Sequence, residues 1–329
     1  MNLATVFLLF GGLGLFLYGM KLMSEGLEKA AGAKMRGILE LFTKNRFIGM
    51  VVGILFTGIV QSSSATTVMV VSFVNSGLMN LQQASGVILG ANIGTTVTGQ
   101  LIAFDLSEIA PLFVITGVVM VMFSKRMNIK KIGEIVLGFG ILFMGLSIMG
   151  DSMTSFKDSP YVIDFLRTLR NPVLAILAGF VITAVLQSSS ATVGVIILMA
   201  SQGLLEFGIC PFLILGCNMG SCVSALLASL GGKKDAKRAA LIHFLFNVIG
   251  SAVIFVILMT ALTPLTNFML SVSGGNVARA VANTHTAIKI CEVIILFPFM
   301  GWVVKATYKI VPGTDTESEG GFELKYIGK

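Results

Sequence analysis

One hexapeptide occurs twice in this chain, and the two copies belong to a repeat that runs through most of the sequence. Gln61-Ser-Ser-Ser-Ala-Thr66 recurs as Gln187-Ser-Ser-Ser-Ala-Thr192, 126 positions later. The same offset, without a gap, pairs Leu89-Gly-Ala-Asn-Ile-Gly-Thr95 with Leu215-Gly-Cys-Asn-Met-Gly-Ser221. A register held over that distance indicates a duplicated unit, and a duplication constrains the fold more than any single predicted helix.

The composition places this repeat in a lipid bilayer. Hydrophobic residues make up 55% of the chain and charged residues 12%, and the mean hydropathy is +0.92. A soluble domain has about 25% charged residues. The net charge of +7 does not indicate a nucleic-acid partner, because the basic residues form short clusters between apolar runs, as in membrane proteins.

Hydropathy predicts about seven full spans, since each needs about 20 mostly apolar residues. We expect two repeat units (1–128 and 129–262), a final span (263–310) and a polar cytoplasmic tail (311–329). The expected spans are 3–24, 84–103, 108–124, 131–151, 207–230, 237–262 and 280–306.

Two apolar segments, 46–77 and 172–203, are interrupted by the Gln-Ser-Ser-Ser motifs. Each arm has about 14 residues and reaches about 21 Å as a helix, which is short of the roughly 30 Å hydrocarbon core. We therefore expect re-entrant helical hairpins with the motifs at their tips. Hydropathy leaves open the alternative that each hairpin crosses the membrane twice. The expected fold class is an all-α membrane protein built from an inverted repeat.

Basic residues predict the orientation. Lysine and arginine cluster after the first, third, fifth and seventh spans, for example at 125–131 and 233–238. The positive-inside rule then predicts a multi-pass protein of the cell inner membrane, with the N-terminus outside and the C-terminus in the cytoplasm. Three spans separate the starts of the two units, so the units are inverted and their hairpin tips meet near the midplane. Inverted repeats with a site at their interface are typical of secondary transporters.

The hairpin tips have the chemistry of an anion site. A broken helix exposes backbone N–H groups and the positive end of its dipole, and serine hydroxyls add donors. These donors suit a tetrahedral oxyanion that is bound and then released. The alternative is that small residues only permit close helix packing. The predicted substrate residues are Gln61, Ser62, Ser63, Ser64, Gln187, Ser188, Ser189 and Ser190.

A second set of polar residues predicts cation coordination. Gly90–Thr96 and Gly216–Cys222 interrupt two spans, and the carbonyl, amide and hydroxyl oxygens freed there are hard ligands suited to sodium. No other metal is expected. The predicted sodium ligands are Thr66, Asn92, Thr95, Thr96, Thr192, Asn218 and Ser221. Further polar residues expected nearby are His243, Asn247, Asn283, His285, Thr286, Lys289 and Glu292.

These motifs, together with the segments 238–247 and 282–286, resemble the type II sodium-phosphate cotransporter family over about residues 10–305. The resemblance implies sodium-driven uptake of inorganic phosphate by alternating access, with phosphate at the paired motifs, sodium as the coupling ion and no other cofactor. The resemblance leaves open whether the protein forms a homo-oligomer. Many bacterial members continue into a soluble regulatory domain, which we expect to be absent or truncated here.

The chain departs from the family pattern at two places. The apolar segment 109–115 replaces a charged segment of animal members, and Lys289 stands where bacterial members usually have asparagine. Lys289 lies three residues before Glu292 on the same helix face. We expect a buried ion pair, and as an alternative a lysine charge that replaces a bound cation.

The sequence leaves two other functions open and disfavours a third. The first is a transporter or exporter of another oxyanion, and the second is an uncoupled anion channel or sensor. The third is an enzyme, which the sequence disfavours because no His–Asp pair is placed to activate a serine and no metalloprotease or phosphate-loop motif occurs.

Overall fold

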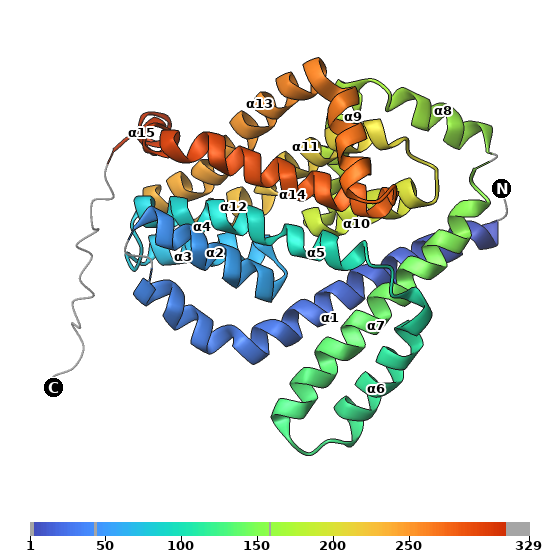
Figure 1. The fold of residues 1–329 in the computed structure, drawn as a ribbon. Coiled ribbons are helices and arrows are strands. Elements are labelled where there is room, and N and C mark those ends of the chain that lie inside the picture. Colours follow the sequence, from blue (N-terminus) through green and yellow to red (C-terminus); the bar gives the residue numbers. More distant parts are fainter. Residues whose placement is uncertain (1–2, 43–44, 158, 314–329) are drawn as a thin grey trace.

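The computed structural model describes residues 3–42, 45–157 and 159–313, and most of the expected tail (314–329) lies outside the described residues. The described part is helical and holds no β-strand, as the sequence predicts (Figure 1). Three short 3₁₀ turns, η1 (Ser107–Ile109), η2 (Phe207–Ile209) and η3 (Phe297–Phe299), join longer helices. The helices are α1 (Leu3–Phe42), α2 (Arg46–Val60), α3 (Ser63–Asn75), α4 (Leu81–Gly94), α5 (Thr96–Ile102), α6 (Ala110–Phe123), α7 (Met127–Thr154), α8 (Pro160–Thr168), α9 (Pro172–Leu186), α10 (Ser189–Ser201), α11 (Cys210–Gly220), α12 (Cys222–Ser229), α13 (Lys234–Val272), α14 (Val277–Leu296) and α15 (Met300–Ile310).

The helix bounds repeat with the offset of the sequence motif. Helices α9 and α10 begin and end 126 positions after α2 and α3, respectively. Helix α4 ends at Gly94 and α11 at Gly220, and the next helices begin two residues later in both cases. The same local sequence therefore produces the same sequence of helices twice.

Glycines allow α4 to pack closely against α2, and α11 to pack closely against α9. A Cβ atom added to Gly90 of α4 would lie 2.0 Å from the carbonyl oxygen of Met50 in α2, and Gly216 of α11 has the same relation to Ile176 of α9. Small residues allow helix backbones to approach this closely in membranes, where lipid does not drive helices together. These glycines serve packing and do not break their helices.

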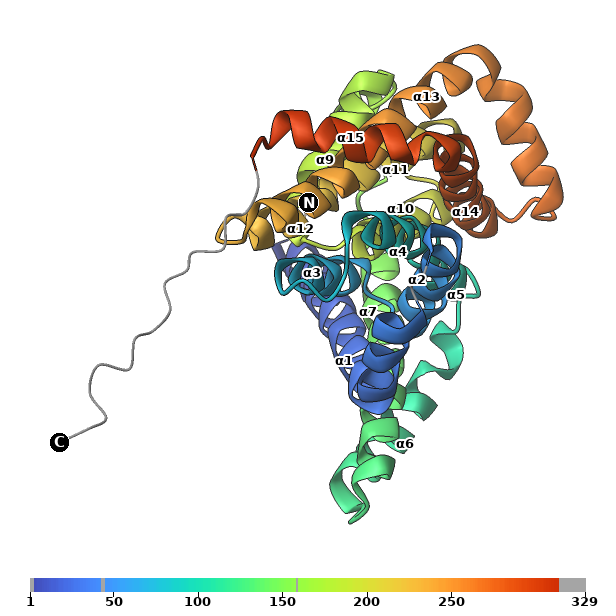
Figure 2. The same ribbon diagram turned by 90° about the vertical axis from the view of Figure 1, so that its left-hand side faces the viewer.

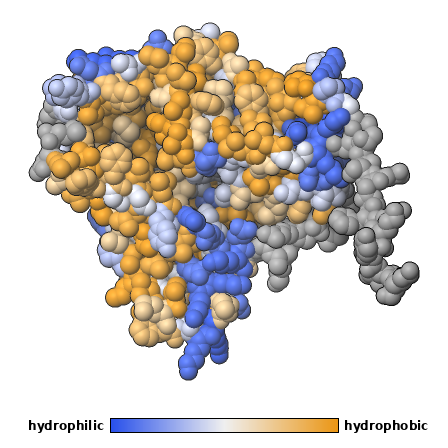
Figure 3. All heavy atoms as spheres, turned by 180° about the vertical axis from the view of Figure 1, so that it is seen from behind, coloured by the Kyte–Doolittle hydropathy of each residue, from blue (hydrophilic) through white to orange (hydrophobic). Residues whose placement is uncertain are grey.

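The model has the dimensions of a multi-pass membrane protein. Within the described residues, five helices are long and apolar enough to cross a bilayer, or up to seven if each of two bent helix pairs counts as one span. Large apolar side chains such as Phe10, Met122 and Trp302 are more than 60% exposed. Hydrophobic residues cover much of the face in Figure 3. An exposed apolar surface of this extent fits contact with lipid.

Several helices extend beyond the expected spans or lie in segments expected to be loops. The first helix continues past residue 24 to Phe42, and the expected external loop 152–171 contains α8. The loop expected at 263–276 is mostly helix, because α13 kinks at Ala261 and continues with Pro264 in the first turn after the kink, where proline is tolerated. The last span is interrupted by η3 around Pro298.

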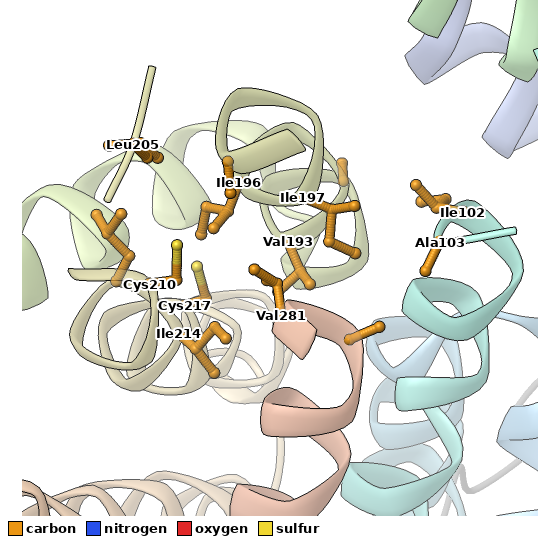
Figure 4. Close-up of a cluster of buried hydrophobic side chains, with 14 of the residues drawn as sticks. Ile102, Ala103, Val193, Ile196, Ile197, Leu205, Cys210, Ile214, Cys217 and Val281 are labelled. Atoms are coloured by element: carbon orange, nitrogen blue, oxygen red, sulfur yellow. The ribbon is translucent and has the colours of Figure 1, made fainter. Parts of the chain in front are cut away.

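The helices form two packed regions. Helices α1 and α7 pack along one another, and α6 packs on α7, so that this group projects from the rest of the molecule (Figures 1 and 2). One buried apolar cluster joins α5, α10, α11 and α14 through Ile102, Val193, Ile214 and Val281 (Figure 4). A second cluster joins α2, α3, α4, α13 and α15. The residues at the break between α2 and α3 and at the break between α9 and α10 line one cavity.

Candidate functional site

Each Gln-Ser-Ser-Ser motif is a tight turn between two helices, and the glutamine forms the bend. Gln61 ends α2 with φ of 60°, and Gln187 ends α9 with φ of 56°. This left-handed backbone is uncommon for a residue other than glycine. The Gln187 side chain stabilises the bend by donating to the carbonyl of Ala184 at 2.7 Å, and Gln61 makes the same contact with Gly58.

The first serine of each motif caps the following helix. The hydroxyl of Ser62 accepts from the backbone N–H of Ala65 at 3.2 Å, and Ser188 accepts from Ala191 at the same distance. An N-cap of this kind satisfies one of the free donors at a helix start. The second and third serines therefore lie in the first turn of α3 and α10, where backbone N–H groups have no carbonyl partner within the helix.

A threonine links the two arms of each turn. Thr66 accepts from Thr57 at 2.9 Å, and its repeat equivalent Thr192 accepts from Thr183 at 2.9 Å. Both also donate to the carbonyl of the capping serine. These two predicted sodium ligands are buried and already serve to hold the hairpin arms together.

The two tips lie against one another. The hydroxyl of Ser64 donates to the backbone carbonyl of Gln187 at 3.4 Å, and the hydroxyls of Thr95 and Ser190 are 3.1 Å apart. All eight residues of the two motifs line one cavity of about 450 Å³. The structure thus brings together the complete set of residues predicted to bind the substrate.

Helix α1 contributes the remaining polar wall of this cavity. Lys21, Ser24, Glu25 and Glu28 line it, and the Lys21 ammonium lies 3.8 Å from the Glu25 carboxylate. None of these four residues was predicted to belong to the site, and Glu25 and Glu28 lie beyond the expected end of the first span, in a helix that continues. The lining contains one basic side chain and two acidic ones, so an anion would depend on neutral donors and helix ends.

Hydrogen bonds from α5 and α12 hold the side chains of the two tip glutamines. Thr98 of α5 donates to Oε1 of Gln61 at 2.9 Å, and Ser224 of α12 donates to Oε1 of Gln187 at 2.6 Å. Thr98 and Ser224 are themselves 126 positions apart. Neither residue was among the predicted site residues, although the repeat offset pairs the two hydroxyls.

The predicted interruptions at Gly90–Thr96 and Gly216–Cys222 are slight. The joint residues Thr95 and Ser221 keep right-handed helical backbone, and their N–H groups still bond to carbonyls four residues earlier. The carbonyls of Ala91 and Cys217 therefore remain in helical hydrogen bonds across the joints. The hydroxyls of Thr96 and Ser221 donate to the carbonyls of Ile93 and Asn218, both within their own turn.

A buried ionic cluster joins both repeat units to α14. The Lys289 ammonium donates to Oδ1 of Asn92 and of Asn247, each at 2.7 Å, and lies 3.3 Å from the Glu292 carboxylate. Asn218 donates to the other Glu292 oxygen at 3.2 Å. All five side chains are buried, and we call them the Lys289 cluster. The predicted ion pair is confirmed.

The other polar residues predicted on the last two long helices do not line the cavity between the tips. Asn283 and Thr286 accept from Gln100 of α5, at 3.1 and 3.0 Å. His243 and His285 are buried, and neither ring nitrogen of His285 has a hydrogen-bond partner in the described part of the chain.

Comparison with known proteins decides the class of this site. The sequence model of one family, the Na+/Pi-cotransporter family, matches residues 15–151 and 162–274. The chain belongs to this family. Cotransporters are membrane transporters and not enzymes, in agreement with the sequence prediction and with the apolar helices of the structure.

Two bacterial relatives align with most of the chain. "Uncharacterized protein YqeW" of Bacillus subtilis is 29% identical over 300 residues, 90% of this chain and 95% of the relative. "Putative inorganic phosphate export protein YjbB" of Salmonella typhimurium is 28% identical over 316 residues, 95% of this chain.

Animal relatives match a shorter stretch. "Sodium-dependent phosphate transport protein 2A" of Rattus norvegicus is 41% identical over 107 residues, 31% of this chain. The aligned part makes up 57% of the Salmonella protein and 16% of the rat protein, so the chain spans only part of their length. No solved structure matches the chain.

Proposed function

We propose that this cotransporter takes up inorganic phosphate together with sodium by alternating access, and that phosphate binds between the two Gln-Ser-Ser-Ser tips. The observation that carries this proposal is the single cavity of about 450 Å³ lined by all eight motif residues. Family membership supplies the substrate class. A site between related units is typical of transporters that expose one site alternately to either side.

The cavity offers phosphate the donors it requires. The hydroxyls of Ser63, Ser64, Ser189 and Ser190 lie in the first turns of two helices whose N-termini meet there. Helix N-termini bind anions through free N–H groups and a favourable dipole. Because these donors are neutral and the one lysine in the wall lies 3.8 Å from the Glu25 carboxylate, binding remains reversible, as transport requires.

Sodium is proposed to bind at Asn218, in the second repeat unit. Oδ1 of Asn218 is buried and has no hydrogen-bond partner among the described residues, whereas Asn92 already faces an ammonium. An amide oxygen is a hard ligand. We therefore propose Asn218 as the sodium ligand most directly supported, with Ser221 three residues further along the chain.

The orientation is also a proposal. With the N-terminus outside and the C-terminus in the cytoplasm of the inner membrane, the units are inverted and the hairpins re-enter from opposite sides. Lys21, Glu25 and Glu28 then lie toward the cytoplasm, at the end of the part of α1 that is expected to cross the membrane. The cavity in this structure accordingly corresponds to an inward-facing state.

Export of phosphate is the second candidate. One observation favours it: a relative named as an inorganic phosphate export protein aligns with 95% of this chain. The same site serves either direction, since the ion gradients decide the net flux.

The decisive experiment is flux of labelled phosphate in proteoliposomes. We expect uptake driven by an inward sodium gradient, no accumulation with choline, and competition by arsenate stronger than by sulfate. Accumulation that is indifferent to sodium would overturn coupled uptake, and efflux driven by an outward gradient would favour the export candidate.

A further inference from the structure

The Lys289 ammonium lies in a cage of oxygens from three helices. Oδ1 of Asn92 in α4 and Oδ1 of Asn247 in α13 are each 2.7 Å away, and Oε2 of Glu292 is 3.3 Å away. The ring of Phe246 lies 5.9 Å from the same nitrogen. Lys289 is 2% exposed, so these groups replace its hydration.

The oxygens point into the cage for a reason independent of Lys289. The Asn92 amide nitrogen donates to the carbonyl of Ile88, and that of Asn247 donates to the carbonyl of His243, both at 2.9 Å. Each bond goes to the carbonyl four residues earlier in the same helix. Because the nitrogen of each amide is held by its own helix, the oxygen is directed toward the centre whatever cation lies there.

The repeat-related asparagine is in a different situation. Asn218, the equivalent of Asn92, turns its nitrogen toward Glu292, and its oxygen has no partner in the described part of the chain. Of these two equivalent asparagines, only Asn92 therefore accepts a hydrogen bond from a lysine ammonium. An internal salt bridge alone does not require two amide oxygens held in this way.

We propose that Lys289 is a tethered cation that fills a monovalent-cation site made by Asn92, Asn247 and Glu292. Without the ammonium, Glu292 is a buried carboxylate without a compensating charge, which is strongly unfavourable. A sodium ion in the cage restores neutrality and receives the same two amide oxygens. The wild-type site thus carries no exchangeable ion, and removing the lysine side chain creates one.

The consequence for coupling rests on the proposed function: a transporter with this site filled by lysine moves one sodium ion fewer per cycle than a variant in which the site is open. The existence of the site does not rest on it. A binding experiment without transport therefore tests the cage even if phosphate flux proves independent of sodium.

The test is thermal unfolding of the purified full chain in detergent, followed by circular dichroism in sodium chloride and in choline chloride. We expect Lys289→Ala to be less stable than wild type in choline and to regain stability in sodium. The melting temperature should rise saturably by about 5 °C more than any rise seen for wild type. The same measurement in lithium chloride and in potassium chloride shows how selective the site is for sodium.

Two matched variants make the outcome specific. Lys289→Met fills the cage with an apolar chain of similar length, and Lys289→Ala/Glu292→Gln removes both charges, so both should lack the additional sodium shift. A sodium shift in Lys289→Ala equal to that of wild type overturns the proposal. So does failure of both Lys289→Ala and Lys289→Ser to fold in high sodium while Lys289→Met folds, because sodium should replace the ammonium.

Discussion

Ser64 and Gln187 touch across the boundary between the two repeat units: the serine hydroxyl at the start of α3 donates to the backbone carbonyl of the glutamine that ends α9, at 3.4 Å. The partners are 123 residues apart in sequence and belong to the two copies of one motif. Both repeat units therefore form the wall of the cavity between the tips.

Removal of a tip hydroxyl should weaken phosphate transport without unfolding the protein. Ser63→Ala and Ser189→Ala each delete a donor in the first turn of a helix that lines the cavity. A hydrogen bond to a charged group is worth about 1.5–3 kcal/mol, so transport at low phosphate should fall by about 10- to 100-fold. The measurement is initial uptake against phosphate concentration in proteoliposomes.

Ser72→Ala is the control for these variants. Ser72 is also in α3, but it is exposed and donates to the carbonyl of Val68 in its own helix at 3.0 Å. Its uptake should match wild type. Normal uptake in both tip variants, at equal protein incorporation, would show that the tips serve packing and not binding.

The capping serines should behave differently from their neighbours. Ser62→Ala and Ser188→Ala remove an N-cap bond, which costs about 1 kcal/mol of stability. We expect a melting temperature lower by about 2 °C, measured by circular dichroism in detergent. Ser62→Asn keeps a capping oxygen and should restore the melting temperature, whereas an equal loss in the asparagine variant would argue against a cap.

Thr98 and Ser224 should affect transport through the tip glutamines. Thr98→Val keeps the shape of the side chain but cannot donate to Gln61, and Ser224→Ala has the same effect on Gln187. A neutral hydrogen bond contributes about 1 kcal/mol, so we expect about a fivefold loss of uptake rate in each. Thr98→Ser retains the donor and should transport normally, and an equal loss in that variant would remove this role.

The doubled motif made the tips predictable because the chemistry of the site is local in sequence. The glutamine bend, the capping serine and the arm-linking threonine lie within ten residues of one another in each unit, and the offset of 126 carries each role to the other copy. The hydrophobic pattern likewise located most helices, because lipid requires long apolar runs.

The contributions of other helices were not predictable in the same way. Glu25 lines the cavity because α1, which contains no proline, runs on past the expected membrane boundary. Lys289 reaches Asn92 from 197 positions away, so its partner is decided by tertiary packing. The glycines at 90 and 94 read as helix breakers in sequence, but their lack of a side chain serves the approach of α2.

That close approach leads to a stability prediction. A methyl group on Gly90 would collide with the backbone oxygen of Met50, which no side-chain rotation relieves. We expect Gly90→Ala to destabilise the protein by about 1–3 kcal/mol, as overpacked cores do, despite the better helix propensity of alanine. Gly58→Ala is the matched control in α2, because its nearest neighbour is a Val97 methyl at 3.6 Å, and it should melt at or above the wild-type temperature.

The inverted arrangement of the hairpins can be tested at two repeat-related turns. Ser76 follows α3 and Gln202 follows α10, each at the end of a hairpin and 126 positions apart. If the hairpins re-enter from opposite sides, a cysteine at 76 lies toward the cytoplasm and one at 202 toward the outside, in agreement with the positive-inside rule. We expect a membrane-impermeant thiol reagent to label Ser76→Cys only in inverted vesicles and Gln202→Cys only in right-side-out vesicles.

The labelling experiment needs a background without the four native cysteines, of which Cys291 is exposed on the surface of α14. Labelling of both positions from the same side would contradict the inversion, because parallel units place equivalent turns on one side. A hairpin that crosses the membrane twice also returns to the side it left. The expected labelling from opposite sides is therefore compatible with full crossing as well as with re-entry. A further cysteine at Ser64 separates the two cases. A re-entrant tip that lines a cytoplasmic cavity is protected by phosphate, whereas a tip on the far side is labelled only from outside.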